Sequence, residues 1–310
     1  MKTNTLGKTL LQVTPLGFGG APVGYLGAGQ ARISAILGKL LDSGINVIDT
    51  AECYPGSEEA IGKAVGHRRD DYVLITKCGH RVEGLNGEEW SPALIDASVD
   101  SSLRRLRTDH IDVMLMHSCD LATLKKGEVL EVLVKARDAG KIRWLGYSGD
   151  NEEAAHAAEL PDVAVIETSI SICDQANIDH VLPRARERNV GVIAKRPLAN
   201  AAWRPLSAQQ GIYADYAKTY TERLEKMRLT PADLGFAGKP ESVWPEIALR
   251  FTIWQAGVST AIVGTTNPER VAANIAAAGR GPMGRDALER IRAAFKKAEA
   301  ESGQVWTGQT

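Results

Sequence analysis

Short apolar runs recur along the chain, each followed by a loop and an amphipathic stretch with helical spacing. Residues 113–116 read Val-Met-Leu-Met, which is apolar at every position and typical of a parallel strand buried on both faces. The pattern predicts strands at 15–19, 46–49, 72–77, 111–117, 142–147, 163–167, 190–194 and 260–263. Helical patterns separate them, for example at 30–41, after a cap at Ser57, after Ser91-Pro92, and before Ala139-Gly140. This alternation predicts a (β/α)8 TIM barrel rather than a doubly wound sheet.

Some segments depart from this repeat. Residues 5–13 predict an N-terminal hairpin that turns at Gly7-Lys8. The connection 195–242, after the seventh strand, is long and contains a helical pattern at 213–227. Residues 285–300 predict a C-terminal helix, and we expect 302–310 to be a loose tail. Because long loops at the carboxyl ends of barrel strands usually cover the ligand site, we expect one barrel domain over 1–310 with 195–242 as a long loop on its active face.

Composition narrows the class of protein. A length of 310 residues is normal for one α/β barrel, and 44% hydrophobic with 24% charged residues indicates a folded globular chain. The net charge of −1 favours neither nucleic acid nor a membrane surface. We see no signal-length apolar start and no membrane-spanning run, and therefore expect a cytoplasmic protein. The four cysteines show no CxxC pairing, so we expect reduced thiols and no metal site, although a zinc site built from them is the alternative.

Four titratable side chains stand where predicted strands end or just beyond. They are Asp49, Tyr54, Lys77 and His117. Each has a simpler interpretation: Asp49 as a helix cap, Tyr54 and Lys77 as surface residues, and His117 as a core histidine. Because the carboxyl ends of barrel strands form the active face, four such groups converging on one mouth favour a catalytic site.

Five phrases, in this order, resemble the aldo-keto reductase family. They are DTAECY (49–54), ITK (75–77), SLRRL with TDHID (102–112), His117, and GKIRWLGYS (140–148). Together with 262–274 they extend over nearly the whole chain. The resemblance implies a TIM barrel and an oxidoreductase that reduces an aldehyde or ketone, or oxidises the matching alcohol or sugar. It assigns Asp49, Tyr54, Lys77 and His117 as the catalytic tetrad.

The chemistry of this tetrad can be argued from the side chains themselves. A free tyrosine has a pKa of about 10, and a neighbouring ammonium on Lys77 would lower it. Asp49 would keep Lys77 charged, and His117 would orient and polarise a carbonyl. We therefore predict Tyr54 as general acid and base. Cys53, beside Tyr54, leads us to predict sensitivity to thiol reagents.

No side chain can deliver hydride, so a nicotinamide cofactor is required. The chain has no Gly-x-Gly-x-x-Gly between an early strand and helix, which excludes a Rossmann site. The stretch 262–274 instead offers hydroxyls, amides at a helix start and an arginine, which suit a phosphate, although Thr266 or Asn267 could simply cap a helix. By resemblance, Arg270 with Thr265 would bind the 2′-phosphate and Asn274 the adenine, which favours NADP(H). Gly264 and Ala273 depart from the lysine and glutamate that many members carry.

The nicotinamide end departs further from the family. Ser148 matches the serine that binds the carboxamide, but Gly149 replaces an asparagine, Glu167 a glutamine and Lys195 a stacking aromatic. We predict an ion pair between Glu167 and Lys195; the alternative is that Lys195 points to solvent. The predicted cofactor-binding residues are Gly20, Asp49, Ser148, Glu167, Lys195, Pro197, Leu198, Gly264, Thr265, Thr266, Arg270 and Asn274.

Loops at the same mouth supply the substrate candidates. They are Pro22, Tyr25, His80, Trp90 and Trp203. Their aromatic, weakly charged character favours a neutral aldehyde, ketone or sugar. Two other classes remain open: a cofactor-binding regulatory subunit like the family's potassium-channel β subunits, and a redox-neutral lyase or isomerase. No feature of the sequence sets the oligomeric state.

Overall fold

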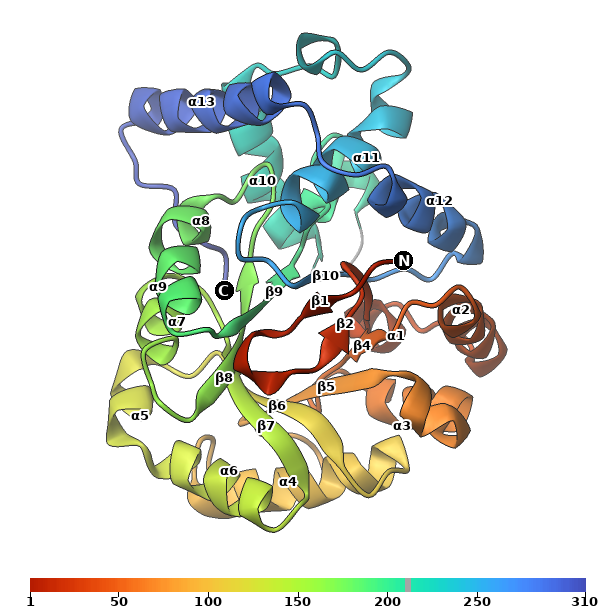
Figure 1. The fold of residues 1–310 in the computed structure, drawn as a ribbon, viewed down its shortest axis with the longest axis vertical. Helices are drawn as coiled ribbons and strands as arrows, with labels where there is room; N and C mark the ends of the chain where they lie inside the picture. The colour runs from red at the N-terminus through yellow and green to blue at the C-terminus, as the bar shows by residue number, and fades with distance from the viewer. Residues whose placement is uncertain (210–212) are drawn as a thin grey trace.

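Eight parallel strands close into a barrel at the centre of the molecule (Figure 1). The computed structural model describes residues 1–209 and 213–310. The strands are β3 (Leu16–Gly19), β4 (Val47–Asp49), β5 (Val73–Cys78), β6 (Ile111–His117), β7 (Ile142–Ser148), β8 (Val163–Ser169), β9 (Gly191–Lys195) and β10 (Thr260–Val263). They pair in chain order, and β10 closes the ring on β3. The predicted barrel is confirmed, with strand bounds shifted by at most two residues.

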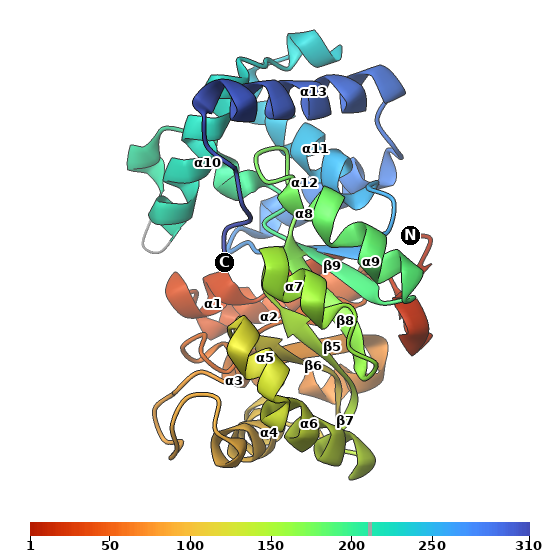
Figure 2. The same ribbon diagram turned by 90° about the vertical axis from the view of Figure 1, so that its left-hand side faces the viewer.

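Helices surround the barrel and connect successive strands (Figures 1 and 2). They include α1 (Ala21–Tyr25), α2 (Gln30–Asp42), α3 (Ser57–Val65), α4 (Pro92–Leu106), α5 (Leu121–Lys126), α6 (Glu128–Asp138), α7 (Asn151–Ala157), α8 (Ala176–His180) and α9 (Leu182–Glu187). Ser91 caps α4 as predicted, since its side chain accepts from the Leu94 amide. The Ser57 prediction is wrong by one residue. Gly56 holds the cap position with φ +67°, while the Ser57 hydroxyl bonds Thr50.

The hairpin of β1 (Asn4–Thr5) and β2 (Gln12–Val13) closes one end of the barrel. Its Leu6 and Val13 are fully buried and pack with side chains from the barrel interior, including Val113 and Leu115. The predicted hairpin is therefore confirmed, and this end of the barrel is filled by apolar side chains. A larger apolar cluster packs between the strands and the surrounding helices.

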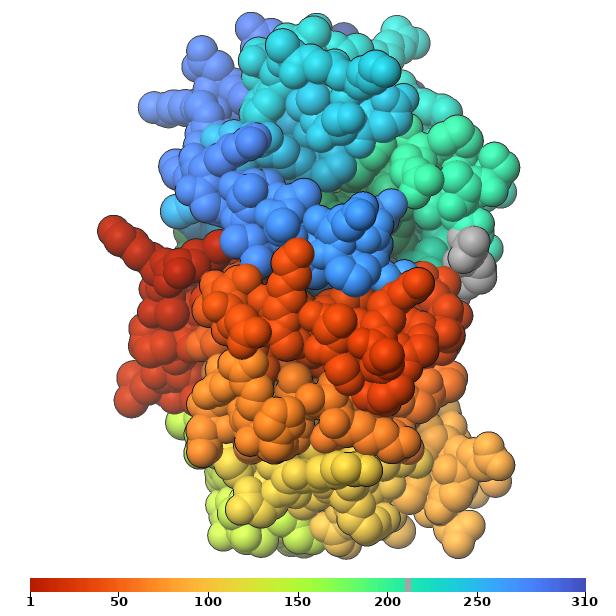
Figure 3. All heavy atoms as spheres, turned by 90° about the vertical axis from the view of Figure 1, so that its right-hand side faces the viewer, coloured from red at the N-terminus to blue at the C-terminus, as the bar shows by residue number. Residues whose placement is uncertain are grey.

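The long connection and the C-terminal residues build a second apolar core beside the barrel. It joins α10 (Tyr213–Met227), α11 (Pro240–Ile253) and α13 (Arg285–Ser302), which lie together at one end of the molecule (Figures 1 and 2). α12 (Pro268–Gly279) lies against α2, so that C-terminal and N-terminal segments meet on the face in Figure 3. This contact follows from the pairing of β10 with β3.

The C-terminal residues 303–310 are not loose, contrary to the prediction. Trp306 is 4% exposed and packs edge-on against Phe295 at 5.0 Å between ring centroids. The backbone amide of Gln309 donates to Asp174 at 3.1 Å, and that of Gly308 donates to Asn151 at 2.7 Å. A single large aromatic and several backbone hydrogen bonds hold a segment that lacks any helical or strand pattern.

Candidate active site

Strand register gathers the candidate residues at the carboxyl ends of β4 to β8. Asp49 ends β4, and Lys77 and His117 stand at or next to the ends of β5 and β6. His117 pairs in register with Ser148 on β7, and Ser148 pairs with Glu167 on β8. The barrel therefore brings the three strand-borne tetrad residues and two of the nicotinamide-end candidates to one mouth.

Lys77 is the centre of a fully buried ion cluster. Its Nζ donates to both oxygens of Asp49 at 2.8 and 2.6 Å and to the Thr50 carbonyl at 2.9 Å. Glu167 Oε2 lies 3.2 Å from the same nitrogen. Burial alone would lower the pKa of Lys77, but Asp49 and Glu167 raise it above its usual value, so Lys77 stays protonated.

The same cluster places two carboxyl groups against one ammonium. Burial, and then Glu167, raise the pKa of Asp49 well above its usual value, against the opposing effect of Lys77. The second carboxylate comes from the position where the family pattern has a neutral glutamine. The surroundings of Lys77 are consequently more negative than the tetrad alone would make them.

Tyr54 and His117 are the tetrad members that keep partial solvent exposure. Lys77 Nζ lies 5.6 Å from the centroid of the Tyr54 ring, and the Tyr54 and His117 rings meet edge-on at 5.9 Å. Burial raises the pKa of Tyr54 above its usual value, although Lys77 opposes this. The predicted lowering by Lys77 is present, but desolvation outweighs it. Burial, and then Lys77, also push the pKa of His117 well below its usual value, so its ring is neutral.

Three of the five substrate candidates adjoin the tetrad in a row of aromatic rings. Tyr25 meets Tyr54 edge-on at 5.6 Å, His80 meets His117 at 5.0 Å, and Trp90 meets His80 at 5.5 Å. The rim beside the reacting groups is therefore largely aromatic.

The other two substrate candidates pack elsewhere. Trp203 stacks on Trp244 at 6.2 Å in the second core. The Pro22 ring lies against Gly264, at the loop that follows β10. Their observed contacts are those of loop packing.

The predicted ion pair between Glu167 and Lys195 is wrong. Lys195 Nζ lies 3.1 Å from Asp150 Oδ2, and Glu167 binds Lys77 instead. The register explains this, because Glu167 pairs opposite Ile193, two residues before Lys195. Two strand residues span about 7 Å, which carries the ammonium past Glu167.

Asp150 is a site residue that the sequence reasoning missed. It is buried at the start of α7, where it accepts hydrogen bonds from Thr168, the Ser169 amide and Asn177 at 2.9, 2.6 and 2.8 Å. The available signal was its position two residues after the end of β7. Polar groups at that position reach the mouth of a barrel as readily as the last strand residue does.

Two departures from the family pattern have steric causes. A Cβ at position 149 would lie 2.4 Å from the Tyr147 hydroxyl, which donates to the Cys119 carbonyl at 2.9 Å. A Cβ at position 264 would lie 2.5 Å from Pro22 Cγ. Tyr147 and Pro22 thus occupy the space that an asparagine or a lysine at these positions would need.

The loop after β10 is shaped by its own hydrogen bonds. The Asn267 amide donates to Thr265 Oγ1 at 3.0 Å, and Asn267 Oδ1 caps α12 by accepting from the Glu269 amide at 2.9 Å. Arg270 follows within the first turn and is exposed. Backbone amides at the start of a 12-residue helix and a nearby guanidinium are donors that suit a phosphate group.

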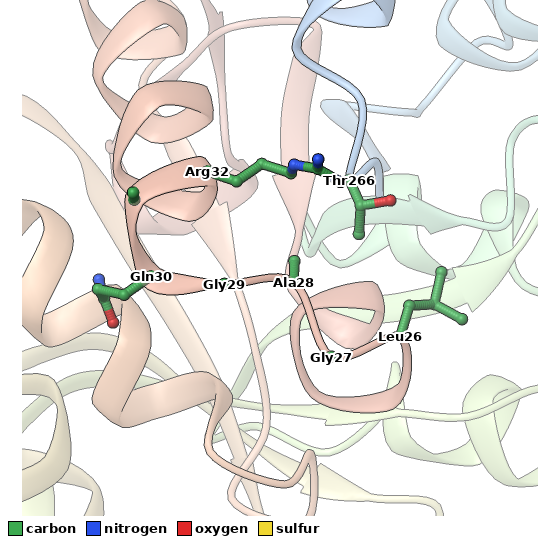
Figure 4. Close-up of a pocket in the computed structure, with 8 residues that line it drawn as sticks. Leu26, Gly27, Ala28, Gly29, Gln30, Arg32 and Thr266 are labelled. Atoms are coloured by element: carbon green, nitrogen blue, oxygen red, sulfur yellow. The ribbon is translucent and has the colours of Figure 1, made fainter.

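A pocket of about 490 Å³ lies beside this loop and was not predicted. It is lined by residues 26–32 and Thr266. Figure 4 shows the Arg32 side chain extending from α2 toward Thr266. The signal for it was the glycine-rich run 27–29 immediately before a helix. Arg32 and Arg270 thus both lie close to the loop after β10.

Within 1–209 and 213–310, no three His, Cys, Asp or Glu side chains cluster as a metal site would require. In the same described ranges no helix is long and apolar enough to cross a membrane. Cys53, Cys78, Cys119 and Cys173 are free thiols.

Comparison with known proteins places this geometry in a family. The model of the aldo/keto reductase family matches residues 15–296. L-galactose dehydrogenase from Arabidopsis thaliana is 27% identical over 89% of this chain and 88% of its own length. NADH-specific methylglyoxal reductase from Escherichia coli is 27% identical over 89% of this chain and 93% of its own.

Solved structures agree with the sequence comparison. The holo form of the aldo-keto reductase AKR11C1 from Bacillus halodurans superposes with a TM-score of 0.78 and 29% identity, over 95% of this chain and 96% of its own. A nicotinamide cofactor and a small carbonyl substrate are consistent with all of these similarities. The chain belongs to the aldo/keto reductase family.

Proposed function

We propose that this protein transfers hydride between NADP(H) and a neutral aldehyde, ketone or sugar, with Tyr54 as general acid and base. The observation that carries the proposal is the buried Lys77, held by Asp49 and Glu167 directly beneath Tyr54. Family membership supports the same reaction class. The nicotinamide, when bound, supplies or accepts the hydride.

Each residue has a distinct part in the reduction direction. Because the pKa of Tyr54 is raised, its phenol is protonated at neutral pH and can give its proton to the developing alkoxide. Lys77 then stabilises the phenolate that remains, and Asp49 keeps Lys77 in place. The neutral His117 ring can donate a hydrogen bond to the carbonyl oxygen and so orient it.

The key experiment compares Tyr54→Phe with Tyr25→Phe. We expect Tyr54→Phe to lower kcat by about 100-fold or more, because the proton donor is lost, while NADPH affinity changes little. Tyr25→Phe keeps the edge-on ring contact and should retain most activity. Turnover is followed as NADPH consumption with a panel of aldehydes, ketones and sugars. Near-normal turnover in Tyr54→Phe contradicts the role of Tyr54, and absence of turnover by the wild type with tight NADPH binding favours a regulatory subunit.

For the cofactor, we propose that Arg270 with Thr265 binds the 2′-phosphate and that Arg32 adds to the positive field around the loop. The support is the donor chemistry at the start of α12 and the approach of Arg32 to Thr266. The name of the Escherichia coli relative specifies NADH, so the preference needs a direct test. Arg270→Ala should weaken NADPH binding by about tenfold and leave NADH affinity nearly unchanged, as measured by fluorescence titration. Arg285→Ala, on the exposed start of α13, is the control, and equal losses for both cofactors contradict the assignment.

A further inference from the structure

Cys53 makes a side-chain contact with His117 that the proposed mechanism does not yet use. Its Sγ lies 3.4 Å from His117 Nδ1. The loop that carries Cys53 is fixed on both sides, because the Glu52 amide donates to the Lys77 carbonyl at 3.3 Å and the Tyr54 amide to the Ala51 carbonyl at 3.1 Å. The sulfur is therefore presented to one particular ring nitrogen.

Both groups in this contact are electrically neutral. Burial raises the pKa of the Cys53 thiol to about 11, so it keeps its proton at neutral pH. Burial also lowers the pKa of His117, and the charge of Lys77 lowers it further. A thiolate–imidazolium pair is thus disfavoured. The contact is between an S–H group and a ring that carries a single N–H.

We infer that Cys53 is a positioning residue that fixes the tautomer of His117, by donating its S–H to Nδ1 and leaving the ring hydrogen on Nε2. A bare imidazole nitrogen is a good acceptor, whereas sulfur is a weak one, so this arrangement is better than Nδ1–H donating to sulfur. The inference rests on the proposed function, in which His117 must donate to a carbonyl oxygen. With the hydrogen on Nδ1, Nε2 would turn a lone pair toward that oxygen and repel it.

Nitrogen-15 NMR of the histidine rings tests the tautomer in the resting protein, without cofactor or substrate. His117→Gln identifies the resonances of His117 by their loss. We expect protonated Nε2 in the wild type, a mixture of tautomers in Cys53→Ala, and recovery in Cys53→Ser, whose hydroxyl can also donate to Nδ1. Cys173→Ala, in the second core, should leave the spectrum of His117 unchanged. Protonated Nδ1 in the wild type overturns the inference, and so does an unchanged tautomer in Cys53→Ala.

Kinetics supply a second readout. Cys53→Ala should lower kcat by about two- to tenfold with a smaller change in KM for the cofactor, since part of the enzyme then holds the wrong tautomer. Cys53→Ser should recover most of the loss. If the wild type is inactive but shows the expected tautomer, only the proposed function is contradicted. If the wild type is active but carries its ring hydrogen on Nδ1, only the tautomer assignment is contradicted.

Discussion

Lys77 and Lys195 both lie at or next to the ends of buried strands and both bind a carboxylate, yet their surroundings drive their pKa values in opposite directions. Lys77 faces two carboxyl groups, which overcome the effect of burial and raise its pKa. Lys195 forms an ion pair with Asp150, and Glu167 acts on it from further away, but burial first, and then the nearby Arg196, lower its pKa below the usual value. The pKa of a buried lysine thus depends on the local balance of charges, and burial by itself does not predict it. Lys77 is a fixed cation under Tyr54, and Lys195 gives up its proton more readily.

Removing each ammonium is the strongest test of this difference. Lys77→Met leaves Asp49 and Glu167 buried together without a cation, which we expect to lower the free energy of unfolding by about 3–5 kcal/mol. Lys195→Met should cost only about 1–2 kcal/mol, because Asp150 keeps its hydrogen bonds to Thr168, Ser169 and Asn177. Urea unfolding at pH 7 measures both. Equal costs for the two variants would show that the two clusters are energetically alike.

The C-terminal residues 303–310 reach Asp150, the partner of Lys195, and so provide a second test of the difference between Lys195 and Lys77. Trp306→Ala should lower the free energy of unfolding by about 3–5 kcal/mol, since it removes a 4% exposed aromatic that packs on Phe295. Trp254→Ala, at a 43% exposed tryptophan, is the control and should cost under about 1 kcal/mol.

Double mutants measure whether this segment is energetically coupled to Lys195 or to Lys77. The Thr310 hydroxyl lies 3.4 Å from Asp150 Oδ2, so loosening the segment should disturb Asp150. Trp306→Ala should couple to Lys195→Met by about 0.5 kcal/mol or more, and be additive with Lys77→Met. Coupling of the same size to both lysines contradicts a local role for the segment.

The contrast between the surroundings of Lys77 and Lys195 also shows which parts of the site the sequence could predict. Strand periodicity located Lys77 and His117 at the barrel mouth, because strand ends in a parallel barrel share one edge. It failed for Lys195, because a flexible four-carbon side chain chooses among several carboxylates, and the choice depends on a two-residue offset in register. The role of Trp306 was missed because one aromatic in an irregular segment has no periodicity to detect.

Glu52 is a buried carboxyl that forms no ion pair with a lysine among the residues the structure describes, which makes it a counterpart to Asp49. One oxygen accepts from the Gly79 amide at 2.8 Å, and burial raises its pKa from 4.5 to about 7. A raised pKa means that the folded protein holds a proton that the unfolded chain releases. Its contribution to stability is therefore complete below about pH 4.5 and is lost as the pH rises through about 7.

The free energy of unfolding should therefore fall less between pH 5 and pH 8 in Glu52→Gln than in the wild type, by roughly 2–3 kcal/mol. Urea unfolding across this range measures the effect. Glu83→Gln, at an exposed position, serves as the control and should follow the wild-type profile. A profile for Glu52→Gln that also follows the wild type would mean that Glu52 is already ionised at pH 5.

The variant with the smallest expected effect, Glu167→Gln, removes only the second carboxylate that faces Lys77. Burial contributes most to the raised pKa of Tyr54, and the charges of Asp49 and Glu167 raise it further. Glu167→Gln leaves the pair of Lys77 and Asp49 intact and should lower the pKa of Tyr54. Since carbonyl reduction needs protonated Tyr54, the alkaline limb of kcat/KM should move to lower pH.

Glu152→Gln, an exposed carboxylate on α7, is the matched control for this pH profile and should leave it unchanged. An unmoved alkaline limb in Glu167→Gln would show that Glu167 has no electrostatic effect on Tyr54. A limb that moves to higher pH would mean that the carboxylate acts mainly by holding Lys77 close to the phenol. The direction in which the alkaline limb moves therefore shows whether Glu167 acts on Tyr54 through its charge or through the position of Lys77.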